Sequence, residues 1–219
     1  MKKSLKVLLM LVVLAFSTFS AVLATKVLSE ERITTDPSDH YYPAIYGDIV
    51  VWRDNINDNW EINGYNLKTK EKFRITTDTS NQDYPAIYGD IVVWQDYRNG
   101  NWDIYGKNLT TGAELAICTK SGDQNTIAIY GDIVVWQDYR NVNIDIYGYN
   151  LKTGQELQIT TNTSDQYEPA IYCDRVVWYD YRNGNYDIYI AYLDVVCETP
   201  KKSLPINWIM KKFGLGDKE

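Results

Sequence analysis

The sequence predicts an all-β protein, a β-propeller built from four antiparallel blades of four strands and 42 residues each. The first observation behind this prediction is a repeat without insertions, in which a tyrosine after Ala-Ile and a tryptophan six residues later recur every 42 residues. The second is that each unit consists of short β-branched and aromatic runs without a helical period. A period of about 40–45 residues is typical of stacked units, and radially repeated sheets form a propeller. The repeated positions are Tyr46, Tyr88, Tyr130 and Tyr172, and Trp52, Trp94, Trp136 and Trp178.

The second copy shows the four strands of the unit most clearly. The expected strands are, in order, Tyr84–Tyr88, Ile91–Asp96, Trp102–Leu109 and Glu114–Ile117. Turn residues separate them: Gly89-Asp90 makes a tight turn, Arg98–Asn101 a hairpin, and Thr111-Gly112 a further turn. The second strand is a continuous β-branched and aromatic run, and the third alternates with a period of two residues. We expect Trp94 and its equivalents to lie in the core between blades.

The outermost strands are displaced by one copy relative to the other three. An Ile-Thr-Thr-like ending occurs at Ile33, Ile75, Ile117 and Ile159. The first of these precedes the first innermost strand, and the fourth copy lacks one. We therefore expect the N-terminal strand at Ile33–Thr35 to complete the last blade and close the ring of a monomer, which removes exposed sheet edges. The alternative is a homodimer, in which an open half-ring joins a second copy into a ring of eight blades.

The chain divides into three segments. Residues 1–24 form a signal peptide, because three early lysines precede the apolar run Val7–Phe16 and small or branched residues lead to a cleavage point after Ala24. An uncleaved anchor is the alternative. Residues 25–200 form the propeller, and residues 201–219 a C-terminal extension that can form a short helix after Pro205. No later segment is apolar enough to span a membrane, so we expect a secreted or cell-surface location.

Composition narrows the class of partner. The chain has 219 residues and a formal net charge of −7. Nucleic-acid binding depends on Lys and Arg meeting phosphate, so nucleic acid is not expected as a partner. No cofactor is predicted. Paired carboxylates such as Asp96 and Asp103 offer oxygen ligands to Ca²⁺, but their spacing matches no EF-hand loop, and pairing with arginine or backbone is favoured. No metal site is predicted.

The repeat resembles a known family. The stretch Pro85–Tyr105 is similar to the TolB-like propeller repeats of archaeal and bacterial cell-surface proteins, and the resemblance covers about residues 30–195 in all four copies. It implies a β-propeller, export, and a binding or scaffolding role rather than a defined catalytic site. A Gly-His…Trp-Asp signature is absent, so the chain does not resemble a WD40 protein.

The candidate binding face gathers the loops at one end of every blade. An antiparallel meander brings the loop between the second and third strands together with the loop that leads into the innermost strand. Tyr, Gln, Asn and Asp around a concavity suit sugars or polar peptide segments. The alternative is structural: the aspartates cap hairpin N–H groups and pair with the arginines. The candidate residues are His40, Gln82, Gln124, Gln166, Tyr97, Arg98, Tyr139, Arg140, Tyr181 and Arg182.

The three cysteines allow one disulfide and one remaining thiol. Cys173 replaces the turn glycine of the other copies, and Cys197 follows the last repeat strand, so a Cys173–Cys197 bridge is the pairing we expect if one forms. Cys118 replaces a strand threonine and has no evident partner.

Catalysis has little support in the sequence. His40 is the only histidine, and near-identical blades repeat the same carboxylate in the same setting, whereas acid–base chemistry needs carboxylates in different environments. We therefore expect no enzyme but an exported binding module at the cell surface, with an extracellular protein or polysaccharide as partner. One alternative is a periplasmic TolB-like envelope component that assists a transport complex. A glycan-acting hydrolase or lyase, in which Glu168 breaks the symmetry, is a weaker alternative.

Overall fold

The structure is a computed structural model that describes residues 26–56 and 58–197. The chain divides into two compact units, residues 1–35 and residues 36–219. The predictions of a signal peptide over residues 1–24 and of a C-terminal extension over residues 201–219 lie outside the described residues. Within the described part, no helix is long and apolar enough to cross a membrane.

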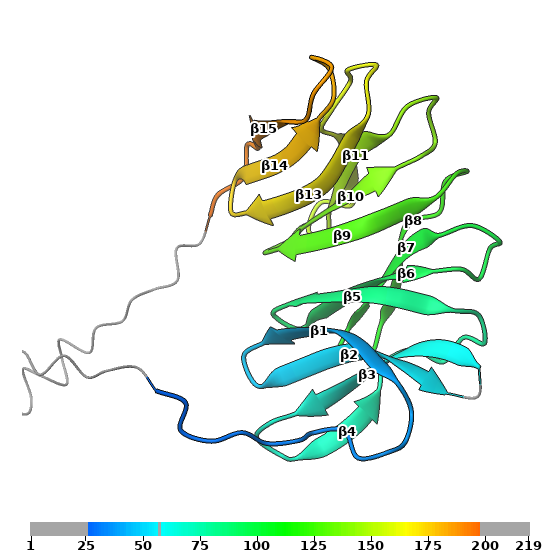
Figure 1. Ribbon diagram of the computed structural model, residues 1–219, viewed down its shortest axis with the longest axis vertical. Coiled ribbons are helices and arrows are strands. Elements are labelled where there is room, and N and C mark those ends of the chain that lie inside the picture. The colour runs from blue at the N-terminus through cyan, green and yellow to red at the C-terminus, as the bar shows by residue number, and fades with distance from the viewer. Residues whose placement is uncertain (1–25, 57, 198–219) are drawn as a thin grey trace, which may run out of the picture. The chain divides into compact units, whose positions relative to one another are not determined.

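Residues 40–192 form fifteen strands in four antiparallel sheets, and the strands of each sheet lie in chain order (Figure 1). The first sheet contains β1 (His40–Tyr46), β2 (Ile49–Ile56), β3 (Asn59–Asn66) and β4 (Glu71–Arg74). The second contains β5 (Gln82–Tyr88), β6 (Ile91–Asp96), β7 (Asp103–Asn108) and β8 (Glu114–Cys118). The third contains β9 (Gln124–Tyr130), β10 (Ile133–Asp138), β11 (Asp145–Asn150) and β12 (Gln155–Gln158). The fourth contains β13 (Gln166–Tyr172), β14 (Arg175–Asp180) and β15 (Asp187–Tyr192).

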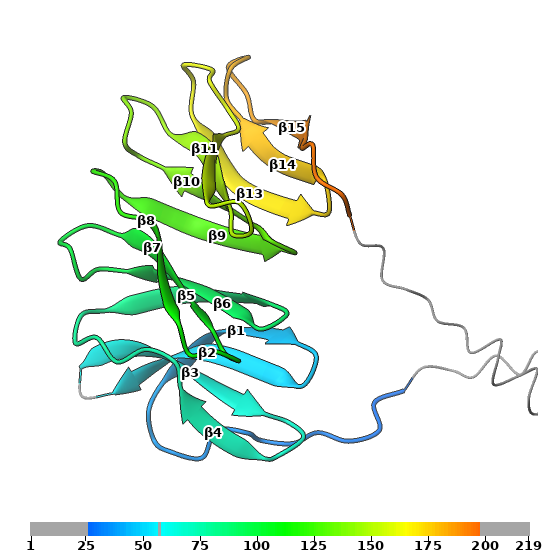
Figure 2. The ribbon, with the colours of Figure 1, turned by 180° about the vertical axis from the view of Figure 1, so that it is seen from behind.

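The sheets follow one another in chain order, and their innermost strands pack in series. β1 packs on β5, β5 on β9, and β9 on β13. Within residues 36–197, both ribbon views show β13–β15 at the end of this series away from β1–β4 (Figures 1 and 2). The predicted four-blade meander is therefore present.

Three apolar clusters lie between neighbouring sheets and join them. The first combines Val51 and Ile62 of the first sheet with Val92 and Trp94 of the second. The same positions, 42 residues later, make the second and third clusters. Trp94 and Trp136 are fully buried, which confirms the prediction that this column forms core between blades. Burial of each valine or isoleucine side chain in these clusters stabilises the fold by roughly 1.5–3 kcal/mol.

The innermost strands share a bulge at one position. The register of β1, β5 and β13 shifts just after their second residue. A residue there takes a left-handed backbone conformation in all four strands, which is uncommon for residues other than glycine. The four residues are Tyr42, Tyr84, Thr126 and Glu168, with φ of 52°, 47°, 53° and 48°.

A buried aspartate ends the second strand of the second, third and fourth sheets and binds the hairpin that follows. Asp138 is fully buried. Its carboxylate accepts the Trp136 indole N–H at 2.8 Å, the Arg140 backbone N–H at 2.9 Å, and the Arg140 Nε and Nη2 groups at 2.8 and 2.6 Å. Asp96 and Asp180 repeat this set of contacts. We call this arrangement the aspartate clasp.

The predicted N-terminal strand is not formed. Residues 26–39 contain no strand, and the fourth sheet has three strands rather than four. A lone strand has little stability apart from the sheet that it joins. The prediction is corrected to the extent that this segment is not a strand, and β15 is the outermost strand of the fourth sheet.

The aspartate clasp should carry much of the stability of each sheet. We expect Asp138→Asn to lower the free energy of unfolding by about 3 kcal/mol, because removing one partner of a buried ion pair leaves the other without compensation. Urea denaturation measures this loss. Asp132→Asn, at an exposed aspartate in the same sheet, is the matched control and should change stability little. Equal stability of the two variants would show that the clasp is dispensable.

Candidate functional site

The arginines of the predicted face are engaged within their own hairpins. The guanidinium groups of Arg98, Arg140 and Arg182 hold the clasp carboxylates. They also lie over the rings of Tyr105, Tyr147 and Tyr189 at 4.0, 4.1 and 4.0 Å. This is the structural alternative that the sequence left open. Burial opposes ionisation of Asp180, but hydrogen bonds from Arg182 and Trp178 outweigh it and lower the pKa of its carboxyl.

The glutamines of the predicted face are buried rather than presented to solvent. Gln82, Gln124 and Gln166 are each 0% exposed. Their Nε2 groups donate to backbone carbonyls of the preceding loop, Gln82 to Ser80 at 2.5 Å and Gln124 to Gly122 at 2.9 Å, while Gln166 donates to Ser164. In this structure the Nε2 groups of the glutamines hold the loop, and the side chains are not exposed to solvent.

His40 occupies the glutamine position in the first sheet and joins a charged cluster. Its Nε2 and Nδ1 atoms lie 3.3 Å from Asp36 and 3.1 Å from the buried Asp54. Two carboxylates and an imidazole can hold a metal ion, but the Lys72 ammonium group lies 3.1 and 2.8 Å from the same two carboxylates. Burial alone would lower the pKa of Lys72, and hydrogen bonds to Asp54 and Asp36 raise it instead.

Lys72 replaces a missing arginine. The first sheet has Ile56 where the others have the clasp arginine, so Asp54 takes its cation from β4 instead. Asp54 also accepts a hydrogen bond from Asn63 at 3.1 Å. We assign the cluster a structural role, since the Lys72 cation supplies the positive charge that a metal ion would bring.

The tyrosines of the predicted face are the members that remain exposed. Tyr97, Tyr139 and Tyr181 are 43%, 37% and 47% exposed. Tyr97 packs edge-on against Trp102 at 5.1 Å between ring centroids. Of the ten predicted residues, these three side chains stay accessible without being used by the clasp or the loop.

The bulged positions of the innermost strands bring further aromatic rings together. The rings of Tyr42 and Tyr84 stack at 4.1 Å, and their hydroxyls lie 3.0 Å apart. The hydrogen bond that Tyr84 donates to Tyr42, together with burial, raises the pKa of Tyr84 to about 12. The Arg53 guanidinium lies 4.9 Å from the Tyr42 ring and pairs with Asp83. In the fourth sheet, burial and a hydrogen bond with Glu168 raise the pKa of Tyr179.

A continuous row of tyrosines crosses all four sheets at the opposite end of the strands. Each ends an innermost strand just before its turn, so the 42-residue step places them side by side. Successive ring centroids lie 4.8, 4.7 and 4.9 Å apart. The two end members, Tyr46 and Tyr172, are 41% and 59% exposed. We call Tyr46, Tyr88, Tyr130 and Tyr172 the tyrosine row.

Hydrogen bonds link the Tyr88 hydroxyl to its two neighbours in the row. Burial, together with hydrogen bonds to Tyr130 and Tyr46, raises the pKa of Tyr88 to about 12. The Tyr88 phenol therefore stays protonated through the physiological range and keeps a hydroxyl group in the row.

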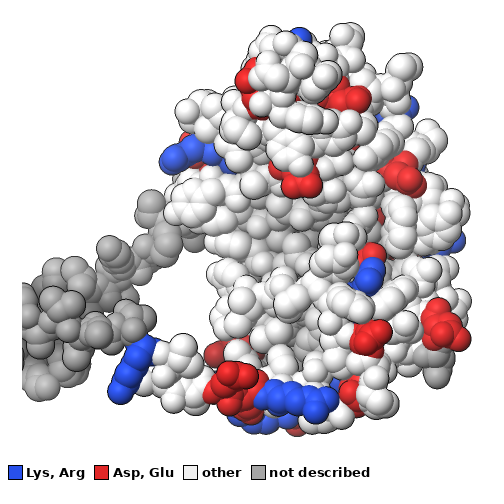
Figure 3. All heavy atoms as spheres, in the orientation of Figure 1, with Lys and Arg blue, Asp and Glu red and all other residues white. Residues whose placement is uncertain are grey.

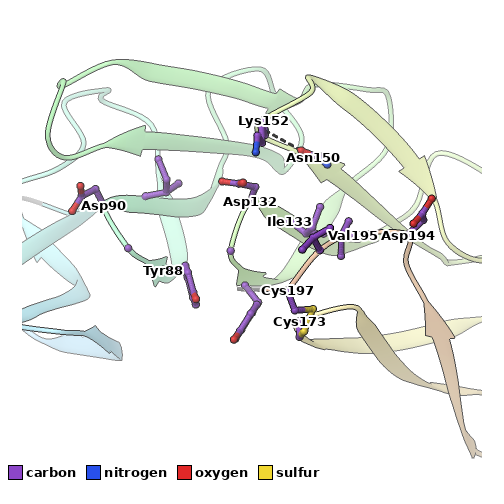
Figure 4. A pocket seen from close by; sticks show the side chains of 15 residues that line it. Tyr88, Asp90, Asp132, Ile133, Asn150, Lys152, Cys173, Asp194, Val195 and Cys197 are labelled. Carbon is purple, nitrogen blue, oxygen red and sulfur yellow. Dashed lines mark hydrogen bonds between the residues drawn. A yellow bond between two sulfur atoms is a disulfide. The ribbon is translucent and has the colours of Figure 1, made fainter. Parts of the chain in front are cut away.

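A cavity of about 680 Å³ lies beside the row (Figure 4). Tyr88 and Tyr130 line it together with the acidic turn residues Asp90 and Asp132. Asn150, Lys152 and the segment Asp194–Cys197 complete the wall. The surface thus combines aromatic rings with carboxylate, amide and ammonium groups.

A disulfide fixes one wall of this cavity. Cys173 and Cys197 are bonded to each other, which ties the segment after β15 to the turn between β13 and β14 (Figure 4). Cys173 has φ of 63° at a turn position where Gly47, Gly89 and Gly131 have φ of 55° to 59°. Cys118 is buried and free, and burial raises the pKa of its thiol to about 12.

Charge is sparse around the innermost strands. Figure 3 shows single acidic and basic side chains set among mostly uncharged residues on the face seen there. A surface of this kind suits a neutral ligand better than a strongly charged polymer.

The tyrosine row is a repeat marker in the sequence and was not predicted as a site. The predicted candidate face lies at the other end of the blades, where polar loop residues gather. The available signal was a tyrosine kept in all four copies at the last position of a strand, directly before the turn.

No family model matches the sequence, and no curated protein matches it. Solved structures do resemble its fold. A structure described as TolB of Agrobacterium tumefaciens has a TM-score of 0.56 at 15% identity, covering 68% of this chain and 58% of its own. TolB of Acinetobacter baumannii has a TM-score of 0.58 at 18% identity, and the match covers 75% of this chain and 43% of the TolB chain. A puromycin-hydrolyzing peptidase of Mycobacterium tuberculosis has a TM-score of 0.60 at 10% identity, and the match covers 75% of this chain and 29% of the peptidase chain.

These likenesses define the class of protein as a β-propeller. More particularly, the chain has a TolB-like propeller fold, as the resemblance of its repeats predicted. It spans 58% and 43% of the lengths of the two TolB structures that it matches.

Replacement of a buried glutamine should affect stability. We expect Gln124→Ala to lower the free energy of unfolding by about 1–2 kcal/mol, because the loop carbonyl of Gly122 loses its donor and a buried volume empties. Thermal unfolding measures this change. Gln155→Ala, at an exposed position of β12, is the control. An unchanged melting temperature for Gln124→Ala would contradict this structural role and would favour a role of Gln124 in ligand binding.

The raised pKa of Tyr88 should make stability fall at alkaline pH. An unfolded tyrosine ionises near pH 10, whereas folded Tyr88 does so at about 12. The contribution is therefore complete below pH 10 and is lost as the pH rises through 12. We expect Tyr88→Phe to reduce this alkaline loss and to remove one late-ionising group from the tyrosinate absorbance titration. An identical titration for both proteins would refute the connected row.

Proposed function

We propose that the protein is an exported, non-catalytic binding module of the cell surface, and that the tyrosine row and its adjoining cavity bind a polysaccharide chain. The observation that carries the proposal is the continuity of the row: four rings in contact, one from each sheet, with the cavity beside the middle two.

The chemistry of this surface supports a carbohydrate ligand. Sugar rings have apolar faces that pack on aromatic side chains and hydroxyls that need polar partners. The cavity supplies such partners in Asp90, Asp132 and Asn150. Its volume of about 680 Å³ lies within the range of ligand sites. A row that crosses four sheets favours an extended polymer over a compact solute.

The arrangement of the acids supports binding rather than catalysis. Asp90 and Asp132 occupy equivalent turns of neighbouring sheets, so they share the same kind of setting. Hydrolysis by paired carboxylates needs one acid kept protonated and one ionised. Glu168, which breaks the symmetry of its column, is engaged with the Tyr179 hydroxyl, and its backbone N–H donates to Gln137 at 2.7 Å.

Export is supported by the leader-like first residues and by the disulfide. Disulfides persist in oxidising compartments outside the cytoplasm, and the Cys173–Cys197 bridge shapes the proposed site. Two TolB structures share the fold at low identity, and a periplasmic envelope component is therefore the competing role.

Affinity electrophoresis through gels that contain a neutral glucan, a chitin-derived polymer or alginate tests the proposal. We expect retardation by at least one neutral polymer and binding at least roughly tenfold weaker for Tyr130→Ala with Tyr172→Ala, which corresponds to about 1.4 kcal/mol or more. The matched control is Tyr97→Ala with Tyr139→Ala at the opposite end. Both double variants should keep the parent melting profile within a few degrees.

Three results would contradict the proposal. Loss of binding in the Tyr97/Tyr139 variant alone would move the site to the loop face. Cross-linking to envelope proteins that depends on Tyr130, without binding to any polymer, would favour the envelope-component role. Release of reducing ends from a bound polymer, abolished by Glu168→Gln, would make the protein a glycan hydrolase.

A further inference from the structure

The fourth sheet ends in an uncovered strand. On β15, Ile188 is 74% exposed and Ile190 is 46% exposed. The equivalents of Ile188 in the other sheets, Ile62, Ile104 and Ile146, are completely buried. β15 therefore presents apolar side chains and an open backbone edge, which is a template for pairing with another strand.

The complete sheets show what normally covers this edge. In the first sheet, the Ile62 carbonyl accepts the N–H groups of Ile75 and Thr76 at 3.0 and 3.2 Å, and the Ile62 N–H donates to Thr76 Oγ1 at 2.9 Å. The third sheet repeats these contacts between Ile146 and the pair Ile159 and Thr160. Ile188 pairs with Tyr179 in the same register as Ile62 with Arg53, so its backbone faces the open edge in the same way.

The clasp arginine of the fourth sheet lacks a second carboxylate among the described residues. Arg98 pairs with Glu114 at 2.6 Å, and Arg140 pairs with Glu156 at 2.7 Å. Both glutamates lie on the outermost strand of their sheet. The described contacts of Arg182 are with Asp180 and the Tyr189 ring, and its side chain is 30% exposed against 20% and 14% for the other two.

The segment Glu30–Thr35 carries the missing groups at the right spacing. Glu30 stands in the column of Glu114 and Glu156, Ile33 in that of Ile75, and Thr34 in that of Thr76. The segment also has the local geometry of a strand ending: Arg32 Nε donates to the Thr34 carbonyl at 2.5 Å, as Arg74 Nε donates to the Thr76 carbonyl at 2.6 Å.

One exchange along this edge distinguishes β15 from the other third strands. Ile190 stands where Gly64, Gly106 and Gly148 make room for a large residue of the outermost strand. At Gly64, an added Cβ would lie 2.5 Å from the Phe73 ring. The N-terminal segment has Glu31 at the position equivalent to Phe73. In this pair the large apolar side chain is therefore Ile190 of β15, and the outermost segment carries the polar residue.

We propose that residues 30–35 of one copy pair with β15 of a second copy, reciprocally, so that two chains form a dimer of eight sheets. A second copy is the occupant because the first and fourth sheets lie at opposite ends of the series within residues 36–197 (Figures 1 and 2). The first sheet is uncovered as well: Ile45 is 62% exposed, whereas its equivalent Ile87, packed on the first sheet, is 8% exposed.

A two-fold arrangement covers both ends at once. The fourth sheet of each copy packs on the first sheet of the other. The closed dimer thus contains two equivalent interfaces, which together bury both open faces of each copy. Such self-complementary pairing is the usual form of a homodimer, and strand addition to an open edge supplies backbone hydrogen bonds as well as side-chain contacts.

Disulfide trapping of the full chain tests the pairing. In the second sheet, Ile104 of the third strand faces Cys118 of the outermost strand. Ile188 and Thr34 occupy the equivalent repeat positions, so we expect them to face each other. We expect Thr34→Cys with Ile188→Cys to give a covalent dimer on a non-reducing gel. Thr35→Cys with Ile188→Cys, one residue out of register, is the matched control and should link poorly. A covalent monomer that has lost two hydrogens would overturn the proposal in favour of closure within one chain, and absence of any link would overturn the pairing.

Light scattering after gel filtration gives an independent measure. The unmodified chain should have twice the monomer mass. Ile33→Asp should raise the dimer dissociation constant roughly tenfold or more, with an unchanged circular dichroism spectrum, because Ile33 lies outside the fifteen strands. A monomeric parent chain, or an Ile33→Asp variant that dimerises as well as the parent, contradicts the proposal.

Discussion

The fold depends on a carboxylate buried at or near the end of each second strand. Asp138 is fully buried and accepts an indole N–H, a backbone N–H and a bidentate guanidinium. A buried charge is tolerated only when its partners compensate the lost hydration. Here the compensation comes from the tryptophan of the core between sheets and from the arginine of the next hairpin. One carboxylate therefore connects the core of the protein to the loop that it supports.

The first sheet shows that the requirement is for positive charge rather than for one residue. Its hairpin lacks the arginine, and Lys72 reaches the carboxylate from β4, the outermost strand of the sheet, at 2.8 Å. The Trp52 indole N–H, by contrast, has no partner there among the described residues. The buried carboxylate thus persists in all four sheets, while the groups that neutralise it have diverged.

The fold was predictable from the sequence because the period and the alternation of apolar residues are local signals. The strand bounds, the meander and the tryptophan core all follow from them. The candidate face was less predictable. The sequence places Gln82 and Arg98 in loops, but a loop residue that donates to its own backbone or pairs with a buried carboxylate is not free for a ligand, and only the contacts reveal this. The pairing of the N-terminal segment was also less predictable, because repeat equivalence shows which position in a sheet it can fill but not in which copy of the chain.

The left-handed bulge of the innermost strands has an evolutionary consequence. Its backbone is the same in all four sheets, yet the side chains are Tyr42, Tyr84, Thr126 and Glu168. The conformation is therefore imposed by the register of the surrounding sheet and not by a glycine. Duplicated copies can exchange aromatic, hydroxyl and acidic groups at this position while the strands keep their pairing. The repeat thus contains a site of variation that is separate from the residues that maintain its architecture.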